Sequence, residues 1–333
     1  REGGALKRDN ATAPATFLTD GLRSTFQNTN LITYKHDNLF DGHNLNAVLG
    51  QESLIRKAER YTQDIEGFTR TYMSNDVWNN LADGTVRPTR PFIEPDYRLF
   101  SYFGRINYDI NGKYLFAASL RADGSSKFSN GNEWGLFPSA SVGWRISDES
   151  FMKEASDRWL SNLKLRGGYG ASGNDNIDNT AFIRSYSSSL SNYLDPLIFP
   201  SIYSAGNTLA NPDLKWETTV TQNVGVDFGF FKNRLNGSIE LYANKTLDAL
   251  MLIPVSGVGY SSQWQNVAST SNKGAELTIN AELVQTKDFN LSFSFNISAN
   301  KNSVISLGSN TSSTFNEAWT RYHSKKPSKT IDT

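Results

Sequence analysis

The stretch LSFSFNISAN, from Leu291 to Asn300, alternates apolar and polar residues without a break. Successive side chains of a β-strand point to opposite faces, so this stretch predicts a strand with one apolar and one polar face. In a water-soluble sandwich the apolar face would pack on a second sheet. In a membrane barrel it would face lipid, and the polar face would line a lumen. The rest of the sequence has to distinguish these two folds.

Composition excludes several classes of protein. The 333 residues include 33 basic and 33 acidic ones and no cysteine, so neither a field that would attract nucleic acid nor a disulfide scaffold or thiolate metal site is expected. No apolar run approaches the roughly 18–20 residues of a spanning helix, so a membrane crossing must use strands. The chain begins at Arg1 without an initiator Met or a signal-like stretch. We interpret it as a fragment or processed piece, whose missing targeting signal says nothing of compartment.

Period-two runs between Gly, Pro, Asn and Asp clusters predict about ten strands, at roughly 22–35, 43–56, 97–110, 113–122, 134–146, 162–172, 215–231, 234–246, 272–284 and 289–302. Connections on one side are short, with a hairpin signal at Asn111-Gly112. The exception, SDESFMKEASDRWLSN, has helical spacing and predicts one short surface helix. Connections on the other side, at 56–96, 173–214 and 247–271, are long, about 25–40 residues each. Long external loops and short periplasmic turns are typical of an outer-membrane barrel.

The charges and the aromatic residues of these strands also favour a barrel. Ten strand charges share the polar parity of their strands: Arg105, Asp109, Arg121, Arg145, Lys164, Arg166, Asp227, Glu240, Glu276 and Glu282. A lipid-facing Lys or Arg near the midplane would cost about 2–4 kcal/mol. The strands are long enough to cross a bilayer, and aromatic residues gather near their ends as in an interfacial girdle: Tyr102, Tyr108, Tyr114, Trp134, Trp144, Trp216, Phe228, Phe230 and Phe231. A sandwich would also segregate charge, so both folds stay open at this point.

Apparent chemical motifs do not carry chemistry. The GYGASG stretch matches a dinucleotide-binding pattern, but a loop sequence follows it where that fingerprint requires a helix. The three histidines have no ligand spacing: His36, His43 and His323. No nucleophile with a nearby base can be picked out. We therefore expect no enzyme, no metal and no cofactor.

Several longer stretches resemble one known family. They are HNLNAVLGQE (43–52), RADGSSKF (121–128), LFPSASVGWRISDESF (136–151), LKLRGGYGASGN (163–174), NPDLKWE (211–217) and NKGAELTI (272–279). Together they resemble the barrel of the SusC/RagA family of TonB-linked outer-membrane receptors, the nutrient importers of Bacteroidota. The resemblance covers roughly residues 20 to 308.

This resemblance implies an all-β fold, an antiparallel transmembrane barrel of 22 strands that holds a plug. It also implies location in the Gram-negative cell outer membrane, a SusD-like surface lipoprotein as lid, and energy from the TonB complex for import of oligosaccharides or peptides. This chain departs from the pattern in extent, because it shows no plug, no TonB-contacting segment and no recognisable closing strand. We expect residues 1–333 to be a portion of the barrel domain of about ten strands.

The sequence favours a nutrient importer of this type, with partners that include a glycan or peptide substrate and outer-membrane lipid but no nucleic acid. The alternatives are a passive porin-like or adhesive barrel and a soluble carbohydrate-binding β-sandwich. Loop aromatic residues that could stack on sugars or meet a partner are Tyr72, Trp78, Tyr186, Tyr193, Tyr203, Tyr260 and Trp264. They could equally pack the loops together. In NPDLKWE, a structural turn rather than a binding site is expected from Asn211, Pro212, Asp213, Trp216 and Glu217.

Overall fold

The computed structural model describes residues 14–69, 71–129, 131–189, 202–255 and 259–308. The chain divides into two compact units, Arg1–Asn28 with Ser53–Leu99 and Thr29–Glu52 with Phe100–Thr333. Within the described ranges, no helix is long and apolar enough to cross a membrane.

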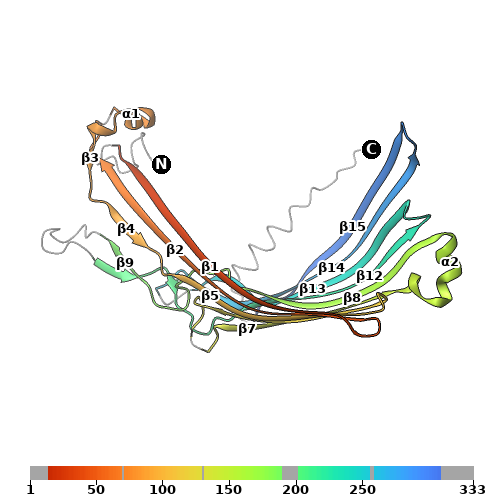
Figure 1. Cartoon of the computed structure of the whole chain (residues 1–333). Coiled ribbons are helices and arrows are strands. Elements are labelled where there is room, and N and C mark those ends of the chain that lie inside the picture. Colours follow the sequence, from red (N-terminus) through yellow and green to blue (C-terminus); the bar gives the residue numbers. More distant parts are fainter. Residues whose placement is uncertain (1–13, 70, 130, 190–201, 256–258, 309–333) are drawn as a thin grey trace, which may run out of the picture. The chain divides into compact units, whose positions relative to one another are not determined.

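The larger unit is built on one sheet that contains all or part of ten long strands (Figure 1). Their order across the sheet follows the chain: β1 (Thr16–Phe40), β2 (His43–Glu66), β5 (Tyr97–Ile110), β6 (Tyr114–Ser125), β7 (Trp134–Arg145), β8 (Leu160–Asn174), β12 (Glu217–Phe230), β13 (Leu235–Pro254), β14 (Ser262–Gln285) and β15 (Asn290–Ser306). The pairings from β6 to β15 are antiparallel. The short β11 (Thr208–Leu209) pairs with β14, while β9 (Tyr186–Ser189) and β10 (Ile202–Ala205) form a separate hairpin.

Tight turns explain why consecutive strands become neighbours. Asn111 and Gly112, between β5 and β6, both have positive φ, 53° and 67°. This is the conformation that a two-residue hairpin needs for its twist to match that of the strands, and Asn and Gly adopt it at least cost. The predicted hairpin is thus confirmed, and the strand predicted at 97–110 is found with the same bounds.

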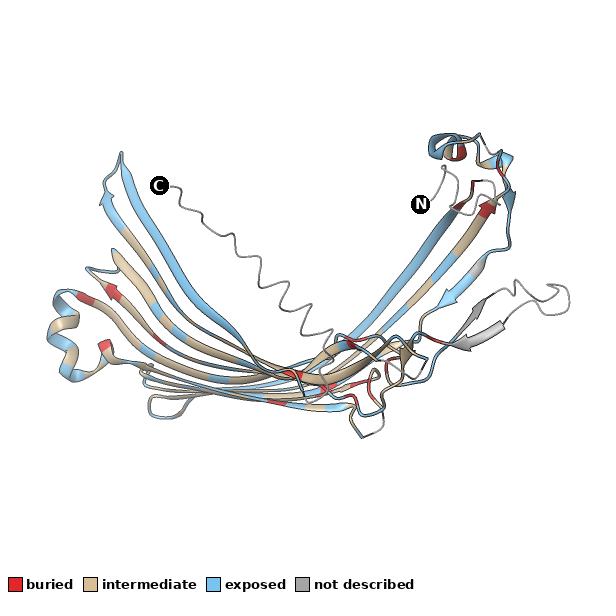
Figure 2. Cartoon of the chain, turned by 180° about the vertical axis from the view of Figure 1, so that it is seen from behind, coloured by how far each residue is buried: buried red, intermediate tan, exposed pale blue. Residues whose placement is uncertain are grey.

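The two faces of the sheet are inverted relative to a water-soluble protein. Along β6, Phe116 and Leu120 on the apolar parity are exposed, whereas Ser119 and Arg121 on the polar parity are partly covered. In Figure 2 most of the length of the strands is intermediate or exposed. The register places the apolar positions of successive strands side by side, as in the row Val142, Gly167, Val224, Leu241, Ala275 and Ala299. We call this continuous apolar surface the belt.

The alternating stretch Leu291–Asn300 in β15 contributes its apolar side chains to the belt. Phe293, Phe295 and Ile297 of β15 are 50%, 42% and 56% exposed. Within the described residues no second sheet covers them, because the sheets are this one and the small β9–β10 hairpin. An uncovered apolar surface that continues across several strands marks a membrane or interaction surface, which favours lipid over a sandwich core.

Stacked aromatic pairs mark both ends of the belt on β7. Trp134 stacks on Tyr102 with ring centroids 6.4 Å apart, and Trp144 stacks on Tyr114 at 6.5 Å. The ten-residue separation of the two tryptophans corresponds to about 34 Å along a strand. At a strand tilt of about 35–45° this projects to about 24–28 Å, which matches the roughly 25 Å apolar band between the aromatic girdles of a membrane barrel.

Two predicted connections are wrong in extent. The connection predicted at 247–271 is mostly strand, because β13 continues to Pro254 and β14 begins at Ser262. Asp248 has a positive φ of 54° at a register shift between β13 and β14, so a bulge interrupts the alternation that the prediction depended on. The connection predicted from residue 56 begins only after Glu66.

The predicted single helix at SDESFMKEASDRWLSN is also wrong in detail. The segment forms two short 3-10 turns, η2 (Ile146–Asp148) and η3 (Ser150–Met152), followed by α2 (Lys153–Arg158). β8 already begins at Leu160, within the stretch that was predicted to be helical.

Three lysines depart from the segregation of charge. Lys245, Lys273 and Lys301 share the parity of the belt, and Lys273 lies between Ala243 and Lys301 in the register. All three lie beyond the apolar run on the side of the long loops. A lysine can hold its ammonium group in a polar layer while its stem covers apolar surface, so such positions are tolerated at the edge of a belt.

The smaller unit contains the outer part of the β1–β2 hairpin and its following connection. β3 (Thr85–Val86) and β4 (Arg90–Ile93) pair with β2. Along the chain, α1 (Ser74–Asn79) and η1 (Leu81–Asp83) follow β2 and precede β3. Val77 of α1 packs with Ile65 and Phe68 in a small core, and Leu81 of η1 packs against it.

Candidate functional site on the polar face of the sheet

An ion-pair network lies on the polar face toward the short turns, where the register brings β8, β12 and β13 together. Arg166 Nε is 3.1 Å from Asp227 Oδ1, and its Nη2 is 2.7 Å from Glu240 Oε2. Asn223 donates to the other oxygen of Glu240 at 2.8 Å. The three charged side chains are each between 27% and 29% exposed. The network is therefore satisfied internally, yet accessible from the polar side.

The network depends on a glycine between its members. Gly225 of β12 pairs with Arg166 on one side and with Glu240 on the other. A Cβ at this position would lie 2.8 Å from Cζ of Arg166. The guanidinium group therefore crosses the strand in the space that a side chain would fill.

A second cluster lies on the same face around Arg121 of β6. Its Nε is 2.7 Å from Asp123 Oδ1, and its Nη2 donates to Ser101 Oγ at 2.9 Å and lies 3.7 Å from Glu52 Oε2. The guanidinium also lies 5.2 Å from the centre of the Phe103 ring. Such multiple contacts fix the position of a side chain that would otherwise be mobile.

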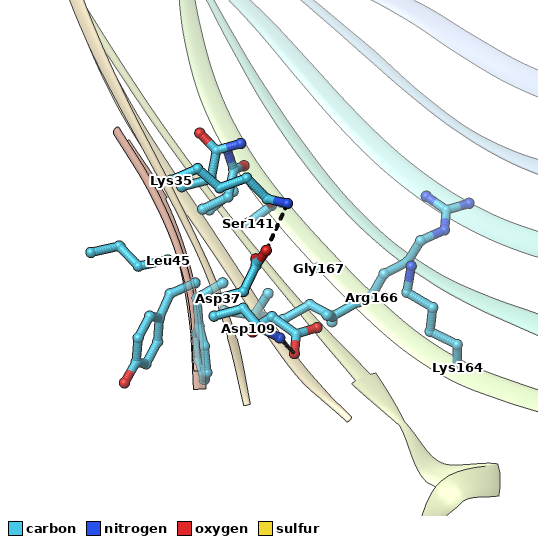
Figure 3. A pocket seen from close by; sticks show the side chains of 18 of the residues that line it. Lys35, Asp37, Leu45, Asp109, Ser141, Lys164, Arg166 and Gly167 are labelled. Carbon is cyan, nitrogen blue, oxygen red and sulfur yellow. Dashed lines mark hydrogen bonds and ion pairs between the residues drawn. The ribbon is translucent and has the colours of Figure 1, made fainter. Parts of the chain in front are cut away.

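A hollow of about 470 Å³ opens on the polar face near the short turns. Figure 3 shows Lys35 and Asp37 of β1 at one side of it and Lys164 and Arg166 of β8 at the other. Lys35 and Asp37 form an ion pair at 2.9 Å. Positively and negatively charged side chains therefore line the hollow together, so a polar solute could bind there.

The NPDLKWE residues lie at the opposite, loop end of the sheet, where Trp216 closes a small core. Trp216 is 9% exposed, and its ring centre is 5.4 Å from those of both Phe128 and Phe137. Its indole N–H donates to the carbonyl of Glu133 at 2.7 Å. Leu214 next to it is fully buried. This core unites stretches that the sequence analysis had singled out separately.

The polar residues of the same motif tie neighbouring strands together. Glu217 accepts from Asn174 of β8 at 3.1 Å and from the backbone N–H of Leu250 in β13 at 2.9 Å. Asn211 donates to the carbonyl of Trp264 in β14 at 2.8 Å.

Two further motif residues have local partners. The side-chain oxygen of Asn211 accepts from the backbone of Asp213 at 3.1 Å, and the carbonyl of Pro212 accepts from Ser129. All these contacts suit the structural turn predicted for the motif. That role stays a prediction.

Three of the predicted loop aromatic residues lie in the larger unit with polar partners. Trp264 donates from its indole N–H to Asp178 Oδ2 at 3.2 Å. Tyr186 is 64% exposed, and its hydrogen bond with Arg184 is the main cause of a raised pKa of that arginine, with a smaller electrostatic contribution from Tyr260. We use the name loop patch for these two sets of loop residues, Asp178 with Trp264 and Arg184 with Tyr186 and Tyr260. Its two charged members, Asp178 and Arg184, were not predicted from the sequence, because no motif marks them.

The other predicted aromatic residues are placed differently. Tyr72 and Trp78 belong to the smaller unit, where Tyr72 packs against the small core and donates to Asp83 at 2.6 Å, which raises the pKa of Tyr72. Trp78 lies on α1. Tyr203 lies on β10 opposite Ser188, and Tyr193 lies outside the described residues.

The fold defines the class of protein: a stretch of membrane-spanning β-barrel wall, with an apolar belt toward lipid and a charged face toward a lumen. The model of the family "TonB dependent receptor-like, beta-barrel" matches residues 4–329, and the chain belongs to this family. Its SusC- and RagA-like members are outer-membrane proteins and transporters rather than enzymes, and the outer membrane is the location of this chain. The soluble sandwich is thereby excluded.

Known relatives agree with this assignment. The chain is 44% identical over 214 residues to the TonB-dependent receptor SusC of Bacteroides thetaiotaomicron. The aligned region covers 63% of this chain and 21% of SusC. The chain is 34% identical over 282 residues to the TonB-dependent receptor P3 of Formosa agariphila, covering 84% and 27%. Among solved structures, that of the RagAB peptide transporter aligns with a TM-score of 0.74 and 25% identity, over 89% of this chain and 32% of that one. The chain thus spans about a fifth to a third of these proteins' length.

Proposed function

We propose that this chain forms the middle to late barrel wall of a SusC-type importer that takes up oligosaccharides or peptides across the outer membrane. One observation carries the proposal. One face of the sheet carries the apolar belt. On the opposite face, the charged side chains of Arg166, Asp227 and Glu240 hold one another in fixed positions through ion pairs. An importer needs such a wall, because lipid must be met on one side and a hydrated path on the other.

The proposal includes two partners. A SusD-like surface lipoprotein would act as lid over the loops, and the TonB complex would supply the energy for import. Similarity to SusC and to the RagAB peptide transporter supports this reading. Both a glycan and a peptide fit the loop patch, since aromatic rings stack on sugars and charged groups bind peptide termini.

Uptake by cells tests the function. The intact gene product is produced in a deletion strain, and accumulation of labelled oligosaccharides or peptides is followed with and without a protonophore. The proposal expects saturable uptake that requires TonB and stops when the proton-motive force is dissipated. Uptake that proceeds at the same rate without energy would instead support the passive porin-like barrel. A parallel strain without the lipoprotein tests the lid.

The loop patch provides the residue-level test. Tyr186→Ala should weaken substrate binding about 2- to 13-fold if the ring stacks on substrate, since aromatic contacts contribute about 0.5–1.5 kcal/mol. Tyr186→Phe should retain most of this affinity. The matched control is Phe289→Ala, which removes another exposed ring, 57% exposed, at the short turn before β15. If all three variants bind substrate with the affinity of the unchanged protein, Tyr186 does not contact the substrate.

A further inference from the structure

The longest connection on the short-turn side, Ile146–Trp159, does more than join β7 to β8. Its turns and α2 fold back on themselves, with Ser156 Oγ donating to the carbonyl of Ser147 at 2.7 Å. Met152 and Ala155 are partly covered. Phe151 and Trp159, in contrast, are 68% and 47% exposed. A short segment that turns its largest apolar side chains outward needs an explanation.

Glu149 ties this segment to the edge of the belt. It accepts hydrogen bonds from the Tyr114 hydroxyl at 2.5 Å, the Trp144 indole N–H at 3.0 Å and the Lys113 ammonium at 3.2 Å. Tyr114 and Trp144 are the stacked pair on the apolar parity of β6 and β7. In membrane proteins the polar tips of such residues lie at the boundary between acyl chains and headgroups, so Glu149 marks that boundary.

The far end of the segment continues the belt directly. Trp159 stacks on Phe230 with ring centres 5.7 Å apart, and Phe230 stacks on Phe228 at 5.6 Å. Both phenylalanines lie on the apolar parity of β12, opposite Leu235 and Gly237 of β13. The exposed side of the segment is therefore contiguous with a surface that meets lipid.

We propose that Ile146–Trp159 is an interfacial anchor, which lies in the headgroup layer of the periplasmic leaflet and inserts Phe151 at the acyl boundary. Its occupant is phospholipid. The segment has two basic and four acidic residues, so its net charge is negative and gives no attraction to anionic headgroups, and insertion of its aromatic side chains carries the binding. The inference rests on the outer-membrane location and is independent of the substrate proposed above.

A single cysteine tests the anchor, because this chain has none of its own. Phe151→Cys is introduced into the intact protein, with any cysteine elsewhere replaced, and labelled with an environment-sensitive fluorophore in phosphatidylcholine nanodiscs. The matched control is Asp157→Cys on the exposed side of α2. Lipid carrying a nitroxide near the headgroup should quench the label at 151 about threefold more than the label at 157, as expected for insertion of about 5–10 Å.

Two different results would contradict the anchor. Quenching of the label at 151 by aqueous iodide, as at 157, would overturn the anchor in favour of a water-exposed segment. Protection from both quenchers would overturn it in favour of a protein partner. A label at Ile239→Cys on the belt should be quenched by nitroxide deep in the acyl chains. Failure there would reject the membrane wall itself, and with it the anchor, whereas loss of substrate uptake alone would leave this result unchanged.

Discussion

A charge placed on the belt should destabilise the protein by an amount that its depth determines. Ile239 lies midway along the apolar run of β13 from Leu235 to Ala243, between Val226 and Leu277, and is 47% exposed. Arginine near the midplane of a membrane barrel costs about 2–4 kcal/mol. Ile239→Arg should therefore lower the folding equilibrium constant in a bilayer about 30- to 900-fold.

The assay is reversible unfolding in guanidinium of the intact protein in phospholipid vesicles, followed by tryptophan fluorescence and by the shift in gel mobility of the folded barrel. The control is Thr278→Arg, which adds the same side chain on the polar face of the neighbouring strand, opposite Ser238. It should cost less than about 1 kcal/mol, because the lumen side is hydrated. Equal losses in the two variants, or a larger loss at Thr278, would refute the assignment of the faces.

Three further predictions concern single contacts. Gly225→Ala places a Cβ 2.8 Å from the Arg166 guanidinium and should lower the free energy of unfolding by about 1–3 kcal/mol; Gly167→Ala, whose nearest new contact is 3.8 Å, should cost clearly less in the same guanidinium titration. Trp216→Phe removes the indole donor to the backbone carbonyl of Glu133 and should lower the free energy of unfolding by about 1–3 kcal/mol in the same titration. An unchanged free energy of unfolding would show that this hydrogen bond is dispensable. The hydrogen bonds to Glu149 lower its pKa below 4.5, so its stabilising effect is present above pH 4.5 and disappears as pH falls through the folded-state pKa; Glu149→Gln should flatten the dependence of unfolding on pH in that acidic range, and an unchanged profile would contradict the contact.

The sequence predicted the strands well where alternation was strict. The strand at 97–110 and its Asn111-Gly112 turn were predicted with the observed bounds, because side-chain period and turn chemistry are local properties. The prediction failed where tertiary structure changes the local pattern. The bulge at Asp248 breaks the alternation of β13, and the polar first half of β14 is strand because it pairs along β13.

The candidate site was predictable in part. Parity alone places Arg166, Asp227 and Glu240 on the polar face, but only the register shows that they form one network across Gly225. The NPDLKWE motif was recognisable as text, although its contacts reach residues more than 50 positions away, such as Trp264. Such pairings depend on how long loops fold back, which no short pattern encodes.

The decisive measurement is the accessibility of spin labels placed one at a time from Leu235 to Ala243 of the intact protein in a bilayer. Oxygen, which concentrates in acyl chains, should broaden the spectra at odd-numbered positions, and a water-soluble nickel complex should broaden those at even-numbered positions such as Glu240. A strict alternation of period two, with the odd positions in lipid, is the predicted result. The reverse phase, or equal exposure of both parities to the nickel complex, would contradict a barrel wall with its apolar belt in the membrane.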